Sequence, residues 1–214
     1  FHGEFEDAAG FGWTVGAPSF DWATLIANKD KEIDRLEKAY RANLERSKVT
    51  IIAERAVLLD AHTVKLASGR TVTAGKILIA TGAWPHLPDM TGAELGITSN
   101  DAFHLKALPE AIAIVGGGFI ALEFAGIFNG LGSKVTVAYR GEQILRGFDD
   151  DLRNDLADAM RKRGVDIHTR CAPVAIEKDG GRLALSLTNG ERLIVDRVMR
   201  ATGRTPNTAN LGLD

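Results

Sequence analysis

The sequence has little of what several classes of protein require. Cysteine occurs once among 214 residues, at Cys171, which excludes an internal disulfide framework and a four-cysteine zinc site. No apolar run reaches the roughly 18 residues that a membrane-spanning helix needs. Basic residues are not in excess, since 26 Lys and Arg stand against 28 Asp and Glu, so neither nucleic acid nor a membrane is indicated as a partner. The five histidines show no metal-ligand spacing, so no metal site is expected.

What is present is the composition of a folded protein. Hydrophobic residues make up 45% and charged residues 25% of the chain, which is enough to form a sizeable core. The 23 glycines favour many tight turns or nucleotide-binding loops. The chain begins at Phe1 rather than at a methionine and ends without a closing element. We therefore interpret it as an internal fragment of a longer protein.

The first part of the chain predicts an ordered connection, a long helix and a series of strands. Residues 1–18 are rich in glycine and aromatic residues and form the connection. Residues 21–47 carry apolar side chains at helical spacing, and Ser19 or Asp21 is the expected N-cap. The apolar face consists of Ile26, Ile33, Leu36, Tyr40 and Leu44. Short strands are predicted at residues 49–52, 57–59, 63–66 and 71–73. Residues 76–82 predict a further strand, buried on both faces.

From residue 111 the pattern becomes β-α-β-α-β, which predicts a parallel sheet with right-handed crossovers. The strands are expected at 111–115, 134–138 and 165–169, and the helices at 119–131 and 149–163. Three alternating strands at 174–177, 183–187 and 192–195 predict an antiparallel meander laid over this sheet. Residues 197–201 return to the sheet.

A glycine fingerprint joins the first of these strands to its helix. Its residues, Gly116-Gly117-Gly118-Phe119-Ile120-Ala121, match the GxGxxA pattern of dinucleotide-binding folds. Gly116 permits the tight turn, and Gly118 lets the backbone approach a pyrophosphate at the helix N-terminus. A plain strand-to-helix turn is the alternative interpretation.

The end of the second strand indicates which nicotinamide cofactor binds. NAD sites usually have an acidic residue there, about 20 residues after the glycines, that binds the ribose. This strand ends instead at Tyr139-Arg140, and Arg146 follows on the same loop. Two guanidinium groups suit the 2′-phosphate of NADP(H). Glu142 could still reach a ribose if the loop were shifted, and the arginines could be ordinary surface residues.

These motifs together resemble the glutathione reductase family, within the flavin-dependent pyridine nucleotide–disulfide oxidoreductases. The resemblance runs through nearly the whole chain and is nearest to bacterial glutathione reductases. It rests on residues 5–13 (FEDAAGFGW), 80–82 (ATG), 116–123 (GGGFIALE), 139–149 and 201–207 (ATGRTPN).

The resemblance implies an α/β fold with two Rossmann-like parts. Residues 1–82 would be part of an FAD-binding domain that carries the long helix. Residues 83–203, with a linker to about residue 109, would be an NADPH-binding domain with a parallel sheet and a meander. Residues 204–214 would return to the FAD-binding domain.

The resemblance also implies roles for single residues. NADP(H) would be held by Gly116, Gly117, Gly118, Phe119, Ile120, Glu123, Arg140, Arg146 and Gly203. FAD would be lined by Ala56, Thr81, Gly82 and Arg204. Phe119 stands where the family often has a tyrosine that gates the nicotinamide pocket, and Glu123 would support catalysis near the flavin. Tyr40 and Asn43 would contact glutathione disulfide, and the asparagine favours glutathione over trypanothione.

The resemblance further implies that no catalytic residue lies in this chain. The redox-active cysteine pair and the acid–base histidine of the family fall outside it, so this segment alone is expected to be inactive. Cys171 cannot replace the pair and is expected to be a buried or edge thiol. The intact protein is expected to be a cytoplasmic homodimer that reduces glutathione disulfide with NADPH and FAD. Related reductases of trypanothione, dihydrolipoamide or mercuric ion, and a non-catalytic NADPH-binding module, remain alternatives.

Overall fold

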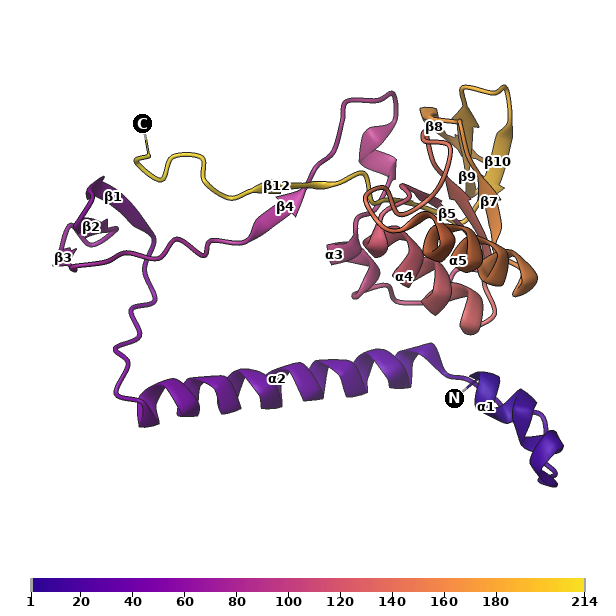
Figure 1. Ribbon diagram of the computed structural model, residues 1–214, viewed down its shortest axis with the longest axis horizontal. Coiled ribbons are helices and arrows are strands. Elements are labelled where there is room, and N and C mark those ends of the chain that lie inside the picture. Colours follow the sequence, from indigo (N-terminus) through magenta and orange to yellow (C-terminus); the bar gives the residue numbers. More distant parts are fainter. Residues whose placement is uncertain (1, 214) are drawn as a thin grey trace. The chain divides into compact units, whose positions relative to one another are not determined.

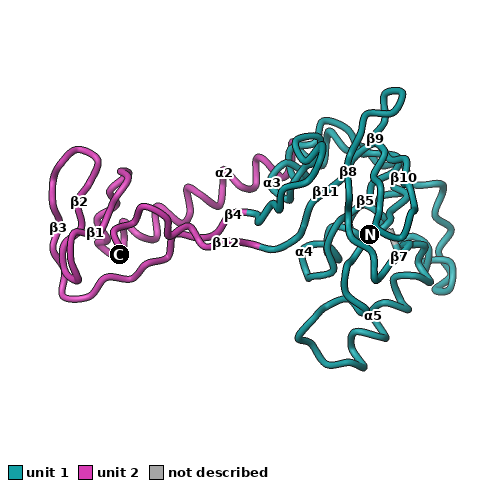
Figure 2. The backbone as a smooth tube through the Cα atoms, turned by 90° about the horizontal axis from the view of Figure 1, so that it is seen from above, with its two compact units in different colours: residues 1–26, 85–203 teal, residues 27–84, 204–214 magenta. Residues whose placement is uncertain are grey.

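The computed structural model describes residues 2–213, and their contacts divide the chain into two units (Figure 2). Unit 1 contains residues 1–26 and 85–203, and unit 2 contains residues 27–84 and 204–214. Each unit is described by itself below. No helix in the described part of the chain combines the length and apolar character that crossing a membrane demands.

Unit 1 is built on a four-stranded parallel sheet with the order β11-β5-β6-β7. Figure 1 labels β5 and β7 of this sheet. The strands are β5 (Ala111–Val115), β6 (Lys134–Ala138), β7 (Asp166–His168) and β11 (Arg197–Arg200). All five residues of β5 are buried, as a central strand covered on both faces requires. The predicted Rossmann-like parallel sheet is therefore confirmed.

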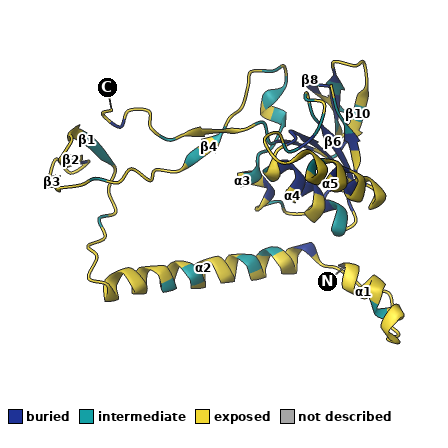
Figure 3. Ribbon diagram, viewed as in Figure 1, coloured by how far each residue is buried: buried dark blue, intermediate teal, exposed yellow. Residues whose placement is uncertain are grey.

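Alternate residues of β5 face two different cores. Ile112 and Ile114 belong to a cluster with the inward sides of α4 (Phe119–Gly130) and α5 (Asp150–Lys162). Ala113 and Val115 belong to a second cluster on the opposite face. Figure 3 shows buried residues concentrated in this sheet and on the inward sides of the two helices.

The second core is closed by an antiparallel meander with the order β10-β9-β8, as predicted. Its strands are β8 (Pro173–Asp179), β9 (Arg182–Leu187) and β10 (Arg192–Val195). Cys171 lies in this core with 1% of its surface exposed, which confirms the expectation of a buried thiol. Unit 1 thus has three layers: helices, parallel sheet and meander.

Short helices complete unit 1. The segment before β5 contains the 3-10 helix η2 (Ala93–Leu95) and α3 (Ser99–Ala102), which begins at a capping box between Thr98 and Asp101. At the N-terminus, α1 (His2–Asp7) and the 3-10 helix η1 (Ala8–Phe11) occupy most of the segment predicted as a connection. The sequence did not predict these two helices, because glycine and aromatic residues give the segment no periodic apolar pattern.

Unit 2 contains most of the long helix α2 (Trp22–Arg46), close to the predicted bounds. The Asp21 carboxylate accepts a 2.8 Å hydrogen bond from the backbone N–H of Thr24, so Asp21 rather than Ser19 caps the helix. The strands β1 (Ala56–Asp60), β2 (Thr63–Leu66) and β3 (Thr71–Thr73) form an antiparallel sheet. A two-stranded pair, β4 (Ala83–Pro85) and β12 (Arg204–Pro206), was not predicted.

Two strand predictions in unit 2 are wrong. Residues 49–52 and 76–82 form no regular structure, and Leu78 is 90% exposed where a doubly buried strand was expected. A strand becomes buried on both faces only when strands flank it and other layers cover it. The described residues place no strand beside 76–82, so the apolar run forms no strand pairing. The apolar face of α2 is also largely open, with Ile33 56% and Leu44 42% exposed.

Candidate functional site

The turn between β5 and α4 begins at a residue, Gly116, whose backbone conformation and surroundings fit only glycine. Gly116 has φ +141°, and a Cβ there would lie 2.3 Å from the carbonyl oxygen of Ala201. The turn is also held to the end of β6, because the Gly116 N–H donates to the Ala138 carbonyl at 3.0 Å. A Cβ at Gly118, in contrast, would meet nothing within 4 Å. The turn is therefore closed toward β11 and open above Gly118.

The open side coincides with the N-terminus of α4. Gly118 is the N-cap residue and offers no side-chain hydrogen bond to the first turn. The first N–H groups of an α-helix have no partner within the helix, and the helix dipole makes this end electropositive. The glycine at the cap leaves room for a ligand group to approach those N–H groups. The geometry suits an anion such as a pyrophosphate.

The loop after β6 carries the two arginines singled out in the sequence. Arg140 and Arg146 are exposed, and within the part of the chain that the structure describes neither makes a hydrogen bond or ion pair through its guanidinium. Glu142 forms a 3.0 Å ion pair with Arg170. The carboxylate that could have bound a ribose is thus paired with an arginine, while the two cations suited to a phosphate are unpaired.

The loop is tied to the glycine turn. The backbone N–H of Leu145 donates to the carbonyl of Gly117 at 2.7 Å. The ring of Tyr139 lies against the same residue, since a Cβ at Gly117 would be 2.5 Å from the ring Cγ. The glycine turn and the arginine loop consequently form one structure in unit 1.

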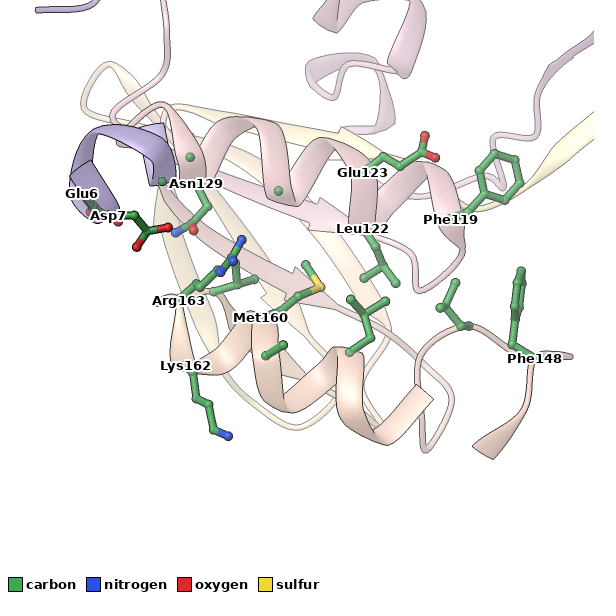
Figure 4. Close-up of a pocket in the computed structure, with 17 residues that line it drawn as sticks. Glu6, Asp7, Phe119, Leu122, Glu123, Asn129, Phe148, Met160, Lys162 and Arg163 are labelled. Atoms are coloured by element: carbon green, nitrogen blue, oxygen red, sulfur yellow. The ribbon is translucent and has the colours of Figure 1, made fainter. Parts of the chain in front are cut away.

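A groove runs between α4 and α5, with a cavity volume of about 850 Å³ (Figure 4). Phe119 and Phe148 stand at one end of it, and Asp7 and Arg163 at the other. Phe119 is 57% exposed, so its phenyl ring is available to cover a ligand beside the helix N-terminus. Glu123 lies one turn further along α4 with an exposed side chain, and Ile120 is half-buried.

Gly203 lies at the point where the chain leaves unit 1. It has φ +130°, and its carbonyl accepts a 2.8 Å hydrogen bond from the N–H of His86. The hydroxyl of Thr202 donates to the carbonyl of His86 at 2.5 Å. These bonds hold the entry and exit segments of residues 85–203 side by side.

Three of the four residues expected to line FAD lie together in unit 2. The Thr81 hydroxyl donates to the carbonyl of Asn207 at 2.8 Å, and the N–H of Asn207 donates to the carbonyl of Gly82 at 3.0 Å. Arg204 donates from its guanidinium to the carbonyl of Ala83. Ala56 lies apart on β1, where it pairs with Leu66.

The residues expected to contact the disulfide substrate lie on α2. Tyr40 is 67% exposed, so it does not serve as a core residue among those described. Asn43 follows one turn later and accepts a hydrogen bond from Arg46. Both residues belong to unit 2, whereas the glycine turn belongs to unit 1.

Comparisons with known proteins decide the family. The profile of the pyridine nucleotide-disulphide oxidoreductase family matches residues 4–214. The chain belongs to this family. It is 51% identical to a glutathione reductase of Burkholderia cepacia over 210 residues, and 37% identical to a trypanothione reductase of Trypanosoma congolense over 231 residues. Each match covers 98% of the chain but 46% of the relative, so the chain spans about half the length of the curated relatives it matches.

A solved structure supports the same assignment. The HOCl-induced flavoprotein disulfide reductase RclA from Escherichia coli is similar with a TM-score of 0.80 and 28% identity. The similarity covers 90% of this chain and 45% of that one. The family's Rossmann-like α/β architecture is therefore present in this chain.

The sequence did not indicate that two further residues, Tyr139 and Arg153, contact the glycine turn and the arginine loop. Tyr139 was noted only as a neighbour of Arg140, and Arg153 was not singled out at all. The contact of Tyr139 with Gly117 depends on tertiary structure, so no sequence signal could have revealed it. Arg153 looks like any polar residue of an amphipathic helix, yet its guanidinium is turned toward the arginine loop.

Proposed function

We propose that this chain contains the NADPH-binding domain, residues 83–203, of an FAD-dependent disulfide reductase. Residues 1–82 and 204–214 belong, in this proposal, to its FAD-binding domain. The observation that carries it is the pairing of an open glycine turn at a helix N-terminus with two unpaired arginines on the adjoining loop. The first feature suits a pyrophosphate, and the second suits a 2′-phosphate.

The residues of unit 1 fit a dinucleotide. Gly116, Gly117 and Gly118 bring the backbone to the pyrophosphate, and Ile120 continues the helix behind them. Arg140 and Arg146 bind the 2′-phosphate through charge-assisted hydrogen bonds. When bound, NADPH supplies a hydride and FAD accepts it.

The remaining residues of the nicotinamide side have narrower roles. Phe119 covers the nicotinamide position until the cofactor arrives, since its ring is 57% exposed beside the helix N-terminus. Glu123 presents a carboxylate one turn away, and Gly203 borders the nicotinamide where a side chain at φ +130° would be strained.

The residues of unit 2 fit a flavin less completely. Hydrogen bonds through Asn207 and Ala83 hold Thr81, Gly82 and Arg204 close together. This arrangement would allow the three residues to contact one ligand. Ala56 would contact adenine through its backbone.

We further propose glutathione disulfide as the substrate. The greater identity to a glutathione reductase, 51% against 37% for a trypanothione reductase, supports this choice. Tyr40 and Asn43 are exposed on one side of α2 and can contact a disulfide-bonded peptide. Reduction proceeds by thiol–disulfide exchange with a cysteine pair outside this chain. A homodimeric state and a cytoplasmic location remain predictions.

The deciding experiment compares NADPH with NADH in the complete protein. We expect wild type to bind NADPH at least about tenfold more tightly, because two charge-assisted contacts act only on the 2′-phosphate. Arg140→Met and Arg146→Met should each lower NADPH affinity and leave NADH affinity unchanged. Arg161→Met, on exposed α5 surface, is the matched control. Equal affinity for the two nucleotides in wild type would overturn the proposal.

A further inference from the structure

The loop between β6 and α5, residues 139–149, has no regular structure, yet one side chain binds two consecutive backbone carbonyls at its middle. The Arg153 Nε donates to the carbonyl of Ile144 at 2.7 Å, and its Nη2 donates to the carbonyl of Gln143 at 3.0 Å. Its third nitrogen, Nη1, binds the Asp150 carboxylate at 2.6 Å. All three nitrogens of the guanidinium are therefore engaged.

This arrangement depends on arginine. The planar guanidinium presents donors in a fixed fork, which can bind two consecutive carbonyls and a carboxylate at once. The side chain of Arg153 is 18% exposed and its two bonds to the backbone carbonyls are partly buried, whereas its Asp150 partner is exposed. A lysine has one nitrogen and cannot reproduce the fork.

The carbonyls that Arg153 holds come directly before a strained turn. Leu145 has φ +52°, a left-handed backbone that is uncommon for a branched residue. Its carbonyl accepts a 3.1 Å hydrogen bond from the N–H of Phe148, which closes a turn with Arg146 and Gly147 at its centre. Ile144, immediately before, is fully buried. The direction of Arg146 is consequently set by a backbone that Arg153 clamps from one side.

The other anchors of the loop hold different atoms from the two carbonyls that Arg153 binds. The Leu145 N–H bonds the carbonyl of Gly117, and the carbonyl of Gly141 accepts from the N–H of Arg170 at 2.9 Å. These backbone bonds lie on either side of residues 143 and 144. The Gln143 side chain also contacts Asn154, one residue after Arg153 on α5. Arg153 thus joins α5 to the part of the loop that precedes Arg146.

We propose that Arg153 is the positioning residue for 2′-phosphate recognition, acting through Arg146 by fixing the carbonyls of Gln143 and Ile144. This inference rests on the proposed NADPH function. Arg153 does not itself contact the nucleotide. A fixed loop holds the Arg146 guanidinium where the phosphate binds, and less conformational freedom is lost on binding. Because NADH has no 2′-phosphate, the effect is confined to NADPH.

The test measures binding of adenosine 2′,5′-bisphosphate and of 5′-AMP to the complete protein by isothermal titration calorimetry. We expect Arg153→Met to weaken the bisphosphate by about tenfold and 5′-AMP by less than about twofold. Arg153→Lys should behave like the methionine variant, because it keeps the charge and loses the fork. Arg161→Met, whose only ion pair is the exposed one with Asp158 among the described contacts, should match wild type.

A double variant separates positioning from a general effect on stability. In the background of Arg146→Met, Arg153→Met should produce no further loss of bisphosphate affinity, since the residue through which it acts is gone. Circular dichroism and thermal unfolding of each variant establish that it is folded. Equal weakening of the two nucleotides, or an additive loss in the double variant, would overturn the inference. If wild type itself failed to distinguish the two nucleotides, the proposed function would fail instead.

Discussion

The ring of Tyr139 occupies the space that a side chain at Gly117 would need. A Cβ at Gly117 would lie 2.5 Å from the ring Cγ, and a Cβ at Gly141 would lie 2.5 Å from the ring Cε1 on the same side chain. Two glycines therefore make room for one aromatic residue at the end of β6. The second glycine of the fingerprint is needed here for packing, whereas the third leaves space for a ligand.

This difference predicts that two neighbouring substitutions affect different properties, one the stability of the fold and the other the binding of NADPH. Gly117→Ala should lower the free energy of unfolding by about 1–3 kcal/mol, because the new methyl group overlaps the base of the Tyr139 ring. Gly118→Ala should leave stability nearly unchanged, since nothing lies within 4 Å of its Cβ, and should weaken NADPH binding. Denaturant unfolding and nucleotide titration of both variants provide the measurement.

A second variant checks the cause of the instability. Tyr139→Ala removes the ring, so the cost of Gly117→Ala should shrink in the double variant. If Gly117→Ala were as stable as Gly118→Ala, the Tyr139 ring would be able to move away from the new methyl group without a loss of stability.

His168 predicts a pH dependence of stability in unit 1. Burial opposes its charge, but hydrogen bonds to Asp166 at 2.7 Å and Glu191 at 2.5 Å together outweigh burial and raise its pKa above 6.5. Both ring nitrogens face carboxylates, which is the geometry of the protonated ring. A raised pKa in the folded state stabilises the fold fully below about pH 6.5, and the stabilisation is lost as pH rises through the raised pKa.

The measurement is the free energy of unfolding between pH 5.5 and 9. The effect should be less than about 1 kcal/mol, because the carboxylates are solvent-exposed and screened. His168→Gln should flatten this part of the profile. A wild-type profile that rises with pH across the same interval would contradict the assignment.

Arg200 holds the segment before β5 against the parallel sheet. Its guanidinium is buried and donates to the carbonyls of Pro88 and Ala93. Arg200→Met should lower the free energy of unfolding by about 1–3 kcal/mol, because both carbonyls lose a charged donor. The amide of Ile97, which bonds the carbonyl of Val198, should exchange faster with deuterium.

A neighbouring arginine on the same strand provides the control for that experiment. Arg197 is exposed and its guanidinium bonds only the carbonyl of Asp196 among the described residues, so Arg197→Met should leave stability and exchange unchanged. Unaltered exchange at Ile97 in the Arg200 variant would show that the segment is held by other contacts.

Cys171 should be chemically inert in the folded protein. It is buried, and burial raises the pKa of its thiol, so little reactive thiolate is present near neutral pH. Peptide mapping after alkylation at pH 8 should find Cys171 unmodified in native protein and modified in denaturant. Rapid native labelling would mean that the meander opens readily from the sheet.

The layered part of unit 1 was predicted well from the sequence, because its strands and helices are indicated by residues that lie close together in the sequence. Each strand of the parallel sheet is a short apolar run, and each helix shows a cap or a periodic face, as at Asp149 and Gly118. The glycine fingerprint likewise combines residues that are adjacent in sequence. Such features require no knowledge of distant contacts.

The errors arose where the outcome depends on distant partners. The run at residues 76–82 has the composition of a buried strand, yet Leu78 is exposed because no strand lies beside it in the described chain. The roles of Tyr139 and Arg153 depend on which backbone atoms they meet after folding. These tertiary contacts cannot be inferred from composition or from the spacing of residues in the sequence.

The hydrogen bond between His86 and Gly203 has a consequence for how this fold can change over time. Residues 86 and 203 enclose the parallel sheet, its helices and its meander, yet the two ends of that stretch are adjacent. A stretch whose ends meet can gain or lose length internally without altering the spacing of the flanking chain. Under the proposed function, changes in nucleotide preference can therefore arise within residues 86–203 while the flanking segments keep their own sequence constraints.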